Sequence, residues 1–528
     1  MEFLGADQII ADGMAFSLRE DNREVSLLWH LIAKMNFPAR LALMNRGLGS
    51  FVFLLFTISS LNAPSALAQI AIPQHNKAAR LNNQGAKLYQ QGQFDAAIAL
   101  YQQALSIEPN SPEIMCNMGL AESRESKYDT AIALYRKALV VRPNFPDSLA
   151  ALGSALDSEG KYDEAVADLQ KALSLKPNDA VTLGNLGLAQ YHQKQYAASV
   201  STYREALGIN SRAFTAWNGM GAALYVQGNV NDAIAAYQKA LALNPAYGDA
   251  MNNLGIIYNK QKRYSDAIAL YQQALAITPN SPATLLNLAK AYGDAGDTEN
   301  AVQNYLRYLN IRENDSEALF QIGRLYAQEG KLDEAASNLE KSAALDPKQA
   351  ETFLNLASVY QVQQKFDQAI DACQKAAALE PNNASALAIL GNAYQSKREF
   401  DQAIAAYQKA LAIQPDFPEA LYELGLTDEW KGDLDGAVTT FQKYIKLEPG
   451  DPRGPFELGN SLFNKGKYPL AVDRYRDAIK LKPDMAMAHY NLSMALARTG
   501  DTQAAEMELN AARKIDPKVG IAQSGSSN

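Results

Sequence analysis

The sequence predicts an all-α protein made of one helical unit repeated many times, and two observations carry this prediction. The stretch DAIAAYQKALALNP at residues 232–245 has near-copies along the chain, and small residues recur at fixed places in each copy. The prolines that end four of these copies are separated by multiples of 34 residues: Pro109, Pro245, Pro279 and Pro415. A period of roughly 20–50 residues is typical of repeat arrays, in which each unit packs on its neighbours.

Each repeat is predicted to form two helices joined by a short turn. Stepping by 34 residues gives thirteen repeats without insertion over residues 78–519. In the sixth repeat the two small residues are Gly255 and Ala267, and Tyr271 is the large residue that follows. Small side chains let two helices approach closely, and the large side chain fills the space between them. Proline disfavours helix at the residue before it, so Pro279 is expected to end the second helix.

The helix starts are predicted from serine, proline and aspartate. Ser111-Pro112 and Ser281-Pro282 each place a capping residue before a proline, which helix N-termini prefer. Aspartates recur where the second helices begin: Asp95, Asp129, Asp163, Asp232, Asp266 and Asp401. We expect these carboxylates to cap the helices or to interact with their positive N-terminal ends, rather than to catalyse a reaction.

Together these positions resemble the pattern of the tetratricopeptide repeat (TPR) family. In the fifth repeat the matching residues are Trp217, Gly221, Leu224, Ala233, Tyr237, Ala240 and Pro245. The resemblance implies a right-handed superhelical solenoid of thirteen helix-turn-helix units with a concave face. The repeats are also similar to those of O-linked N-acetylglucosamine transferases. Because only eleven residues follow Pro517, the catalytic domain of such an enzyme would have to come from a separate chain.

Repeat 7 departs most from the pattern. Ala289 replaces the first small residue, Tyr308 stands where a small residue is usual, and Glu313 replaces the proline. Tyr444 makes the same substitution as Tyr308 in repeat 11, which indicates that tyrosine is tolerated there. The missing proline predicts a junction that can flex.

The sequence of the N-terminal region predicts an extension followed by a signal peptide. Residues 1–43 show no family pattern, and we interpret them as a mis-assigned start, with translation beginning at Met44 or Met35. Residues 44–68 combine a basic start, a short apolar run and the small residues Ala66 and Ala68, which are the parts of a secretory signal. The apolar run is short for a membrane span, which needs about 20 residues.

These parts give a predicted organisation for the whole chain. The mature protein would begin at Gln69, residues 69–77 would be a linker to the repeats, and residues 520–528 would be a disordered tail. The prediction is therefore an exported protein, in a periplasm, a lumen or the extracellular space. If residues 44–68 are instead a buried helix or an uncleaved anchor, the protein would be a cytoplasmic scaffold.

Composition narrows the class of partner. The net charge of −8 argues against a nucleic-acid backbone, which binds basic surfaces. The four histidines are scattered without partners at ligand spacing, so neither a metal nor a cofactor is predicted. Cys116 and Cys373 lie more than seven repeats apart, so no disulfide is expected between them.

The candidate binding residues lie on the first helix of each repeat, two positions before the first small residue. They are Asn83, Asn117, Asn185, Asn253, Asn287, Gln321, Asn355 and Asn491. Asparagine is a poor helix former, so propensity alone does not select it. The resemblance to the transferases implies a ladder of asparagines on the concave face, and such amides can bond the backbone of an extended peptide. The other reading is that each Asn bonds the neighbouring repeat.

Aromatic residues occupy the preceding position toward the C-terminus: Phe320, Tyr422, Phe456 and Tyr490. With Trp430 they can form pockets for a partner's side chains, or they can pack between repeats. The sequence as a whole therefore predicts a non-catalytic scaffold that binds a polypeptide in its groove. The alternative is the substrate-recognition partner of a separate enzyme such as a glycosyltransferase.

Overall fold

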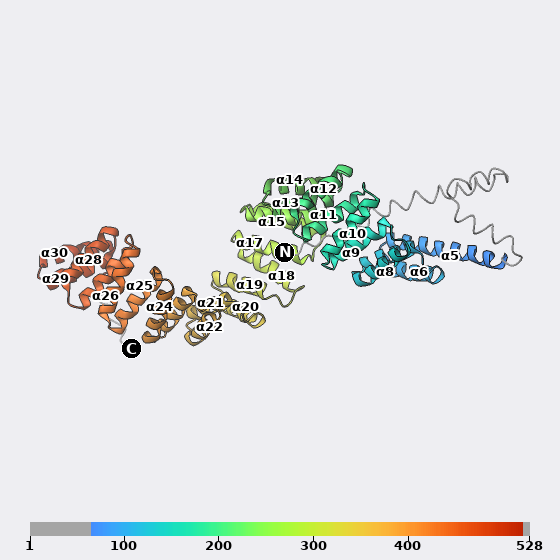
Figure 1. Ribbon diagram of the computed structural model, residues 1–528. Helices are drawn as coiled ribbons and strands as arrows, with labels where there is room; N and C mark the ends of the chain where they lie inside the picture. Colours follow the sequence, from blue (N-terminus) through green and yellow to red (C-terminus); the bar gives the residue numbers. More distant parts are fainter. Residues whose placement is uncertain (1–64, 521–528) are drawn as a thin grey trace. The chain divides into compact units, whose positions relative to one another are not determined.

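The computed structural model describes residues 65–520, which form 26 α-helices and no strand (Figure 1). The predicted extension at residues 1–43, most of the predicted signal peptide and the tail beyond Gly520 lie outside the described residues. The helices follow one another as thirteen helix-turn-helix repeats, and within each unit the two helices of a repeat pack together, as α5 with α6 and α29 with α30 do. This confirms the all-α class and the thirteen repeats.

The first helices of the repeats are α5 (Ser65–Gln90), α7 (Pro112–Arg124), α9 (Pro146–Ser158), α11 (Ala180–His192), α13 (Phe214–Val226), α15 (Gly248–Lys260), α17 (Pro282–Asp294), α19 (Ser316–Gln328), α21 (Ala350–Val362), α23 (Ala384–Ser396), α25 (Pro418–Lys431), α27 (Arg453–Asn464) and α29 (Ala486–Thr499). The second helices are α6 (Phe94–Ile107), α8 (Tyr128–Val141), α10 (Tyr162–Leu175), α12 (Tyr196–Ile209), α14 (Val230–Leu243), α16 (Tyr264–Ile277), α18 (Thr298–Leu309), α20 (Leu332–Leu345), α22 (Phe366–Leu379), α24 (Phe400–Ile413), α26 (Leu434–Leu447), α28 (Tyr468–Leu481) and α30 (Thr502–Ile515).

Helix α5 extends further toward the N-terminus than the first repeat requires. It begins at Ser65, so the backbone of residues 69–77, predicted as a linker, is helical and continuous with the first repeat. The predicted cleavage point between Ala68 and Gln69 lies inside this helix. Among residues 65–520, no helix is both long and apolar enough to cross a membrane.

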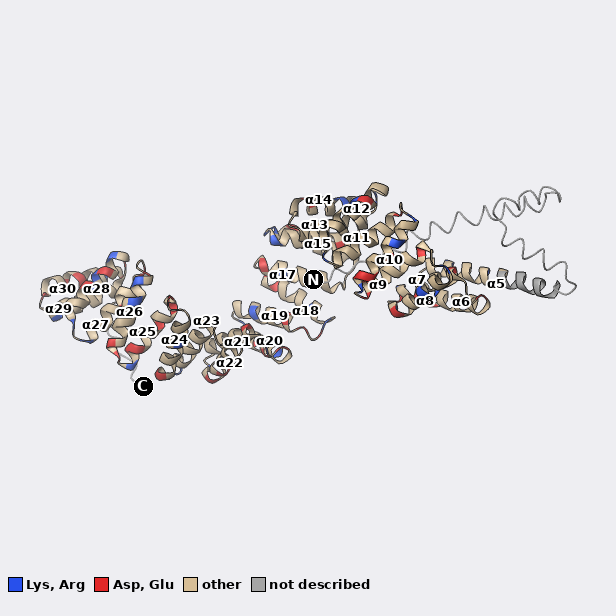
Figure 2. Ribbon diagram, in the orientation of Figure 1, with Lys and Arg blue, Asp and Glu red and all other residues tan. Residues whose placement is uncertain are grey.

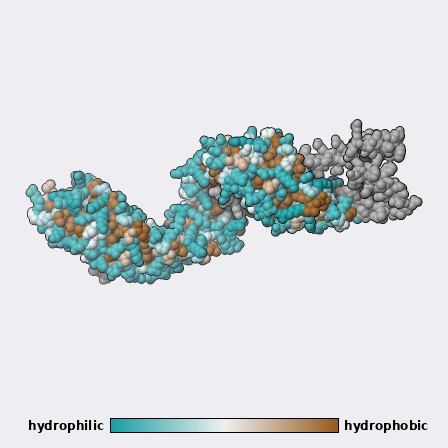
Figure 3. Space-filling model, viewed as in Figure 1, coloured by the Kyte–Doolittle hydropathy of each residue, from teal (hydrophilic) through white to brown (hydrophobic). Residues whose placement is uncertain are grey.

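The surface is mixed in charge and mostly polar. Acidic and basic residues are interspersed along the described helices (Figure 2), and hydrophilic residues cover much of the visible face (Figure 3). Half-exposed apolar side chains nevertheless recur at the last turn of the second helices, as at Val141, Leu175 and Ile209. Their spacing of one repeat shows that even the exposed apolar residues follow the period.

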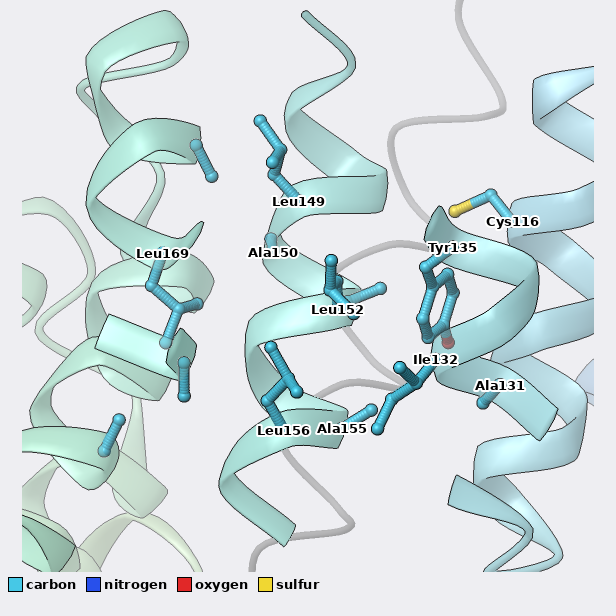
Figure 4. Close-up of a cluster of buried hydrophobic side chains, with 14 of the residues drawn as sticks. Cys116, Ala131, Ile132, Tyr135, Leu149, Ala150, Leu152, Ala155, Leu156 and Leu169 are labelled. Atoms are coloured by element: carbon cyan, nitrogen blue, oxygen red, sulfur yellow. The ribbon is translucent and has the colours of Figure 1, made fainter. Parts of the chain in front are cut away.

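In most repeats a large buried side chain lies between the two helices. In Figure 4, Tyr135 of α8 lies across from Leu152 of α9, and both belong to one buried cluster. The first small residue makes room for this ring. A β carbon at Gly119 would lie 2.6 Å from Cε1 of Tyr135, and one at Gly255 would lie 2.6 Å from Cε1 of Tyr271. Glycine is therefore required here for close approach rather than for its backbone freedom.

The described chain divides into two compact units, with the boundary between Ala295 and Gly296 in repeat 7. This is the repeat that combines Ala289 with Tyr305. Elsewhere a ring at the third position faces glycine, whereas repeat 9 pairs Ala357 with the smaller Cys373. The boundary between the units therefore falls in the repeat whose sequence departs most from the pattern. Cys373 and Cys116 are both buried and are not linked to each other.

Within each unit, the first helices form the inner side of the curve. Successive first helices contact one another, α7 with α9 and α9 with α11 in the N-terminal unit, and α23 with α25 and α25 with α27 in the C-terminal unit. Successive second helices contact one another less. The first helices therefore carry what we call the inner face of each unit.

The two tyrosines that replace small residues have a matching acceptor. The Tyr308 hydroxyl donates to Asp315 and the Tyr444 hydroxyl donates to Asp451, both at 2.6 Å. Asp315 also caps α19 by accepting from the N–H of Ala318. The extra bulk of tyrosine is thus accompanied by a short hydrogen bond to the start of the next repeat.

The recurring aspartates do not cap their helices but take the second role expected for them, close to the positive helix end. They lie inside the first turn, as Asp163 and Asp401 do, where they favour the positive helix end. The N-cap residues of these helices are Lys161 and Glu399, which make no side-chain cap bond. Asp163 instead accepts from Gln193 of the next repeat at 2.6 Å, and Asp401 pairs with a lysine there. These carboxylates therefore join neighbouring repeats at their edges.

Candidate functional site

The predicted asparagines of the N-terminal unit form hydrogen bonds between repeats. The Nδ2 of Asn253 donates to Oδ1 of Asn218 at 3.1 Å, one repeat earlier. Asn287 donates in the same way to Asn252 at 3.0 Å. Each donor amide keeps a second N–H, and each pair fixes the orientation of both amides.

Asn117 follows the same geometry in the second repeat, where it donates to Asn82 at 3.0 Å. The partners Asn82, Asn218 and Asn252 all lie three positions before the first small residue, and they were missed as a group by the sequence reasoning. The sequence does contain a signal for these partners, because each of them lies 35 residues before an asparagine that donates to it.

The remaining predicted amides do not continue one uniform row. Asn185 is buried, whereas Asn83 is exposed. In the C-terminal unit, Gln321 donates to Glu317 of its own helix and Asn355 donates to the carbonyl of Glu351, also in its own helix. Asn491 donates to Asn460 at 2.8 Å, at a different register from the N-terminal pairs.

The predicted aromatic residues have different degrees of exposure. Phe320 is buried in the core, while Tyr422 and Phe456 are half-buried on the inner face. A β carbon added at Gly520 would overlap the ring of Tyr490, so the chain itself covers part of that ring. Trp430 is 57% exposed, with its ring centroid 6.3 Å from that of Phe400.

Carboxylates beside these rings were also missed as site residues. Glu423 and Glu457 occupy the position that carries Asn in other repeats, and Glu429 lies later on α25. Burial raises the pKa of Glu429, and the Glu457 carboxylate raises it further. Burial likewise raises the pKa of Glu457, opposed by hydrogen bonds from Asn460 and Tyr422. The sequence signal that could have identified Glu423 and Glu457 as site residues is that each stands where other repeats carry asparagine.

An ion pair and an aromatic ring flank these carboxylates. Arg453 contacts Asp451 at 2.7 Å, and its guanidinium carbon lies 4.8 Å from the Tyr422 ring centroid. Although burial opposes the shift, hydrogen bonds from Arg453 and Tyr444 lower the pKa of Asp451 to about 2. Asp451 is therefore charged at neutral pH and holds Arg453 in place. Among residues 65–520, no group of three or more His, Cys, Asp or Glu side chains is placed to hold a metal ion.

Comparison with protein families gives one consistent result. Models described as tetratricopeptide repeat match residues 180–212, 218–282, 258–321, 350–383, 419–451 and 456–519. A model described as TPR repeat matches residues 85–123, 156–194, 323–364 and 391–427. The chain is built of tetratricopeptide repeats. The TPR matches fall on the repeats counted from the sequence.

Solved structures with similar repeats include MamA, at 34% sequence identity and a TM-score of 0.30 over 31% of this chain and 95% of that chain. They also include YrrB, described as a TPR protein with an unusual peptide-binding site, at 26% identity and a TM-score of 0.34 over 36% of this chain and 97% of that chain. Yeast Tom70 is similar at 18% identity and a TM-score of 0.32, over 82% and 96% of the two chains. No curated protein matches the sequence. The finer resemblance to the transferase repeats stays a prediction.

Proposed function

We propose that this TPR chain is a non-catalytic scaffold whose inner face binds a partner polypeptide. The observation that carries the proposal is the set of paired amides on the first helices of the N-terminal unit. In the pair of Asn287 with Asn252 the amides are held at 3.0 Å and retain unused donors and acceptors. Groups oriented before binding lose less conformational freedom when a partner arrives, which favours affinity.

The spacing of these amides favours an extended partner over a small molecule. Two of the pairs lie in successive repeats, Asn253 with Asn218 and Asn287 with Asn252, so they offer the same donor and acceptor one repeat apart on the inner face of the N-terminal unit. A polypeptide backbone presents alternating donors and acceptors along its length, and amides bond it without reading its sequence. Specificity then comes from the side chains that flank the amides.

The test compares the binding of a partner to two variants. The partner is first isolated by pull-down and then titrated calorimetrically against the wild type and the triple variant Asn253→Ala, Asn287→Ala and Asn355→Ala. Each lost bond is expected to cost about 0.5–1.5 kcal/mol, so affinity should fall at least about tenfold. Unchanged affinity in a folded triple variant would contradict binding by these amides.

A matched control separates binding from folding. Asn338 lies on the second helix α20 and donates to the carbonyl of Glu334 at 2.8 Å, much as Asn355 donates to Glu351 at 2.9 Å. Asn338→Ala should leave affinity unchanged. If the triple variant instead lost thermal stability and affinity together, the inter-repeat bonds would be the main role of the asparagines.

We also propose that the chain is exported through processing of residues 44–68. The support is the arrangement of basic, apolar and small residues in that segment. Mass spectrometry of the native protein should find Gln69 at the N-terminus. A native chain that retains Met1 would favour the cytoplasmic scaffold. Co-purification of a glycosyltransferase would favour the alternative role in substrate recognition.

A further inference from the structure

Three carboxylates on the inner face of repeats 11 and 12 have only neutral partners in the described structure. They are Glu423 and Glu429 on α25 and Glu457 on α27. The amide donors to these three carboxylates are Gln395, Asn464 and Asn460, at 3.1, 2.8 and 2.8 Å. Among residues 65–520, none of the three has a Lys, Arg or His nitrogen within 4.0 Å. Their negative charge is therefore left without a neighbouring cation.

This arrangement leaves an electrostatic cost in the free protein. Glu429 lies against α27, the helix that carries Glu457, and partial burial together with the Glu457 carboxylate raises the pKa of Glu429. The amide of Asn464 and the hydroxyl of Ser461, both on α27, stabilise Glu429 but carry no positive charge. A cation placed near both carboxylates would relieve the repulsion and the loss of hydration together.

The basic residues nearest in sequence already have acidic partners elsewhere. Lys431 pairs with Asp401 of the previous repeat at 2.5 Å, and Lys465 pairs with Asp435. Arg453 is held by Asp451. The chain thus does not supply the missing cation from these three side chains, which leaves the position to an external group.

Aromatic rings stand directly before two of the carboxylates. Tyr422 precedes Glu423 and Phe456 precedes Glu457, and both rings are half-buried. The Arg453 guanidinium lies over the ring of Tyr422, so this ring already accepts a planar cation on one face. Lysine and arginine combine a charge for carboxylates with an apolar stem for aromatic rings, and both parts gain from such a surface.

We propose that this acidic–aromatic face, formed by Tyr422, Glu423, Glu429, Phe456 and Glu457, binds a basic segment of a partner polypeptide. A lysine or arginine side chain would lie between Glu429 and Glu457, with its stem against Phe456. The proposal rests on the proposed function, because it names the chemistry of the partner on the inner face of the C-terminal unit. Complementary charge here selects the partner and sets its register, while the N-terminal amides are indifferent to sequence.

The test uses the full chain and a fluorescein-labelled probe, the peptide Ac-Lys-Ala-Lys-Ala-Lys-Ala-Lys-Ala-amide. Fluorescence anisotropy should show saturable binding at 50 mM NaCl that weakens at 300 mM NaCl, because salt screens partly exposed charges. The double variant Glu429→Gln and Glu457→Gln should bind the peptide at least tenfold more weakly. Its melting temperature should not fall, since it removes two partly buried charges and keeps their hydrogen-bonding shape.

A charge-matched control makes the result specific. Glu448→Gln with Asp473→Asn removes the same number of charges from exposed positions outside the inner face, and should change the affinity less than twofold. Equal losses in both double variants would reduce the effect to general attraction and overturn the proposal. Equal binding of the matching glutamate peptide, or no saturable binding of the lysine peptide, would also overturn it. Failure here with success of the asparagine test would leave the scaffold function intact.

Discussion

The first helices of the N-terminal unit and those of the C-terminal unit occupy equivalent places in the repeat but carry different chemistry. In the N-terminal unit, Asn253 and Asn287 each donate to an asparagine of the previous repeat. In the C-terminal unit, the same position holds Glu423 and Glu457 beside aromatic rings. At this position the N-terminal unit carries neutral amides paired between repeats, whereas the C-terminal unit carries carboxylates that no cation of the described residues pairs with.

A second pair of equivalent positions repeats this contrast inside the core. In the N-terminal unit, buried Gln190 accepts a hydrogen bond from Thr202 at 2.8 Å. In the C-terminal unit, buried Asp428 accepts from Thr440 at 3.4 Å, across the same interval of twelve residues. The TPR fold therefore tolerates a polar group at this point in both units, and Asp428 can ionise whereas Gln190 cannot. The comparison teaches that pH acts on the repeat that contains Asp428 and not, at this position, on the repeat that contains Gln190.

The largest expected effect concerns Asp428. Burial and the nearby Asp433 carboxylate raise the pKa of Asp428 from 3.8 to about 6. Because the folded pKa lies above the unfolded value, the folded state holds more protons between about pH 4 and 6, and stability falls as pH rises through that range. The loss should be about 1–3 kcal/mol, the upper value being two pKa units and the lower allowing for solvent screening.

Urea unfolding at pH 4.5 and 7, followed by the fluorescence of Trp430, measures this loss. Asp428→Asn should remove most of the pH dependence that Asp428 contributes, and Trp217 in the N-terminal unit serves as the internal reference. An identical pH slope in the wild type and in Asp428→Asn would show that the carboxylate is not the cause. The difference between Asp428 and Gln190 would then not explain any pH dependence of stability.

The next effect tests whether the two units unfold separately. Gly255→Leu places a side chain where even a β carbon would lie 2.6 Å from the Tyr271 ring, and such overpacking costs about 1–3 kcal/mol. Hydrogen exchange should lose protection around repeats 5 to 7, with little change in the C-terminal unit. Gly208→Leu is the control, because a β carbon there meets nothing within 4 Å. Uniform loss of protection throughout the chain would mean that the two units form one cooperative block.

The smallest effect compares two asparagines from the two inner faces. Asn287→Ala leaves the Oδ1 of Asn252 without its donor and should cost about 0.5–1.5 kcal/mol. Asn355→Ala removes only a bond within its own helix and should be neutral or slightly stabilising, because alanine is the better helix former. Chemical denaturation of both variants decides the matter. If both variants lost the same free energy of unfolding, the bond between repeats would stabilise the protein no more than a bond within one helix does.

Much of the fold could be predicted because TPR contacts are local and periodic. Gly255, Tyr271 and Pro279 lie within one repeat, so their spacing alone determines that two helices meet and where the second one ends. The same locality explains why repeat 7, with Ala289, was recognised from the sequence as the most divergent one.

The sequence by itself determined the number of repeats, their helices and the position of the candidate amides. Only the tertiary structure decided what those amides contact, because a bond from Asn287 to Asn252 depends on how one repeat is rotated on the next. It also decided that Asp163 joins two repeats instead of capping a helix, and that residues 69–77 continue α5. The charge of Glu429 and Glu457 was readable from the sequence, but their mutual effect depends on the packing of α25 against α27. Periodicity fixes which residues face the same way, whereas distances between side chains on different helices are fixed only by packing.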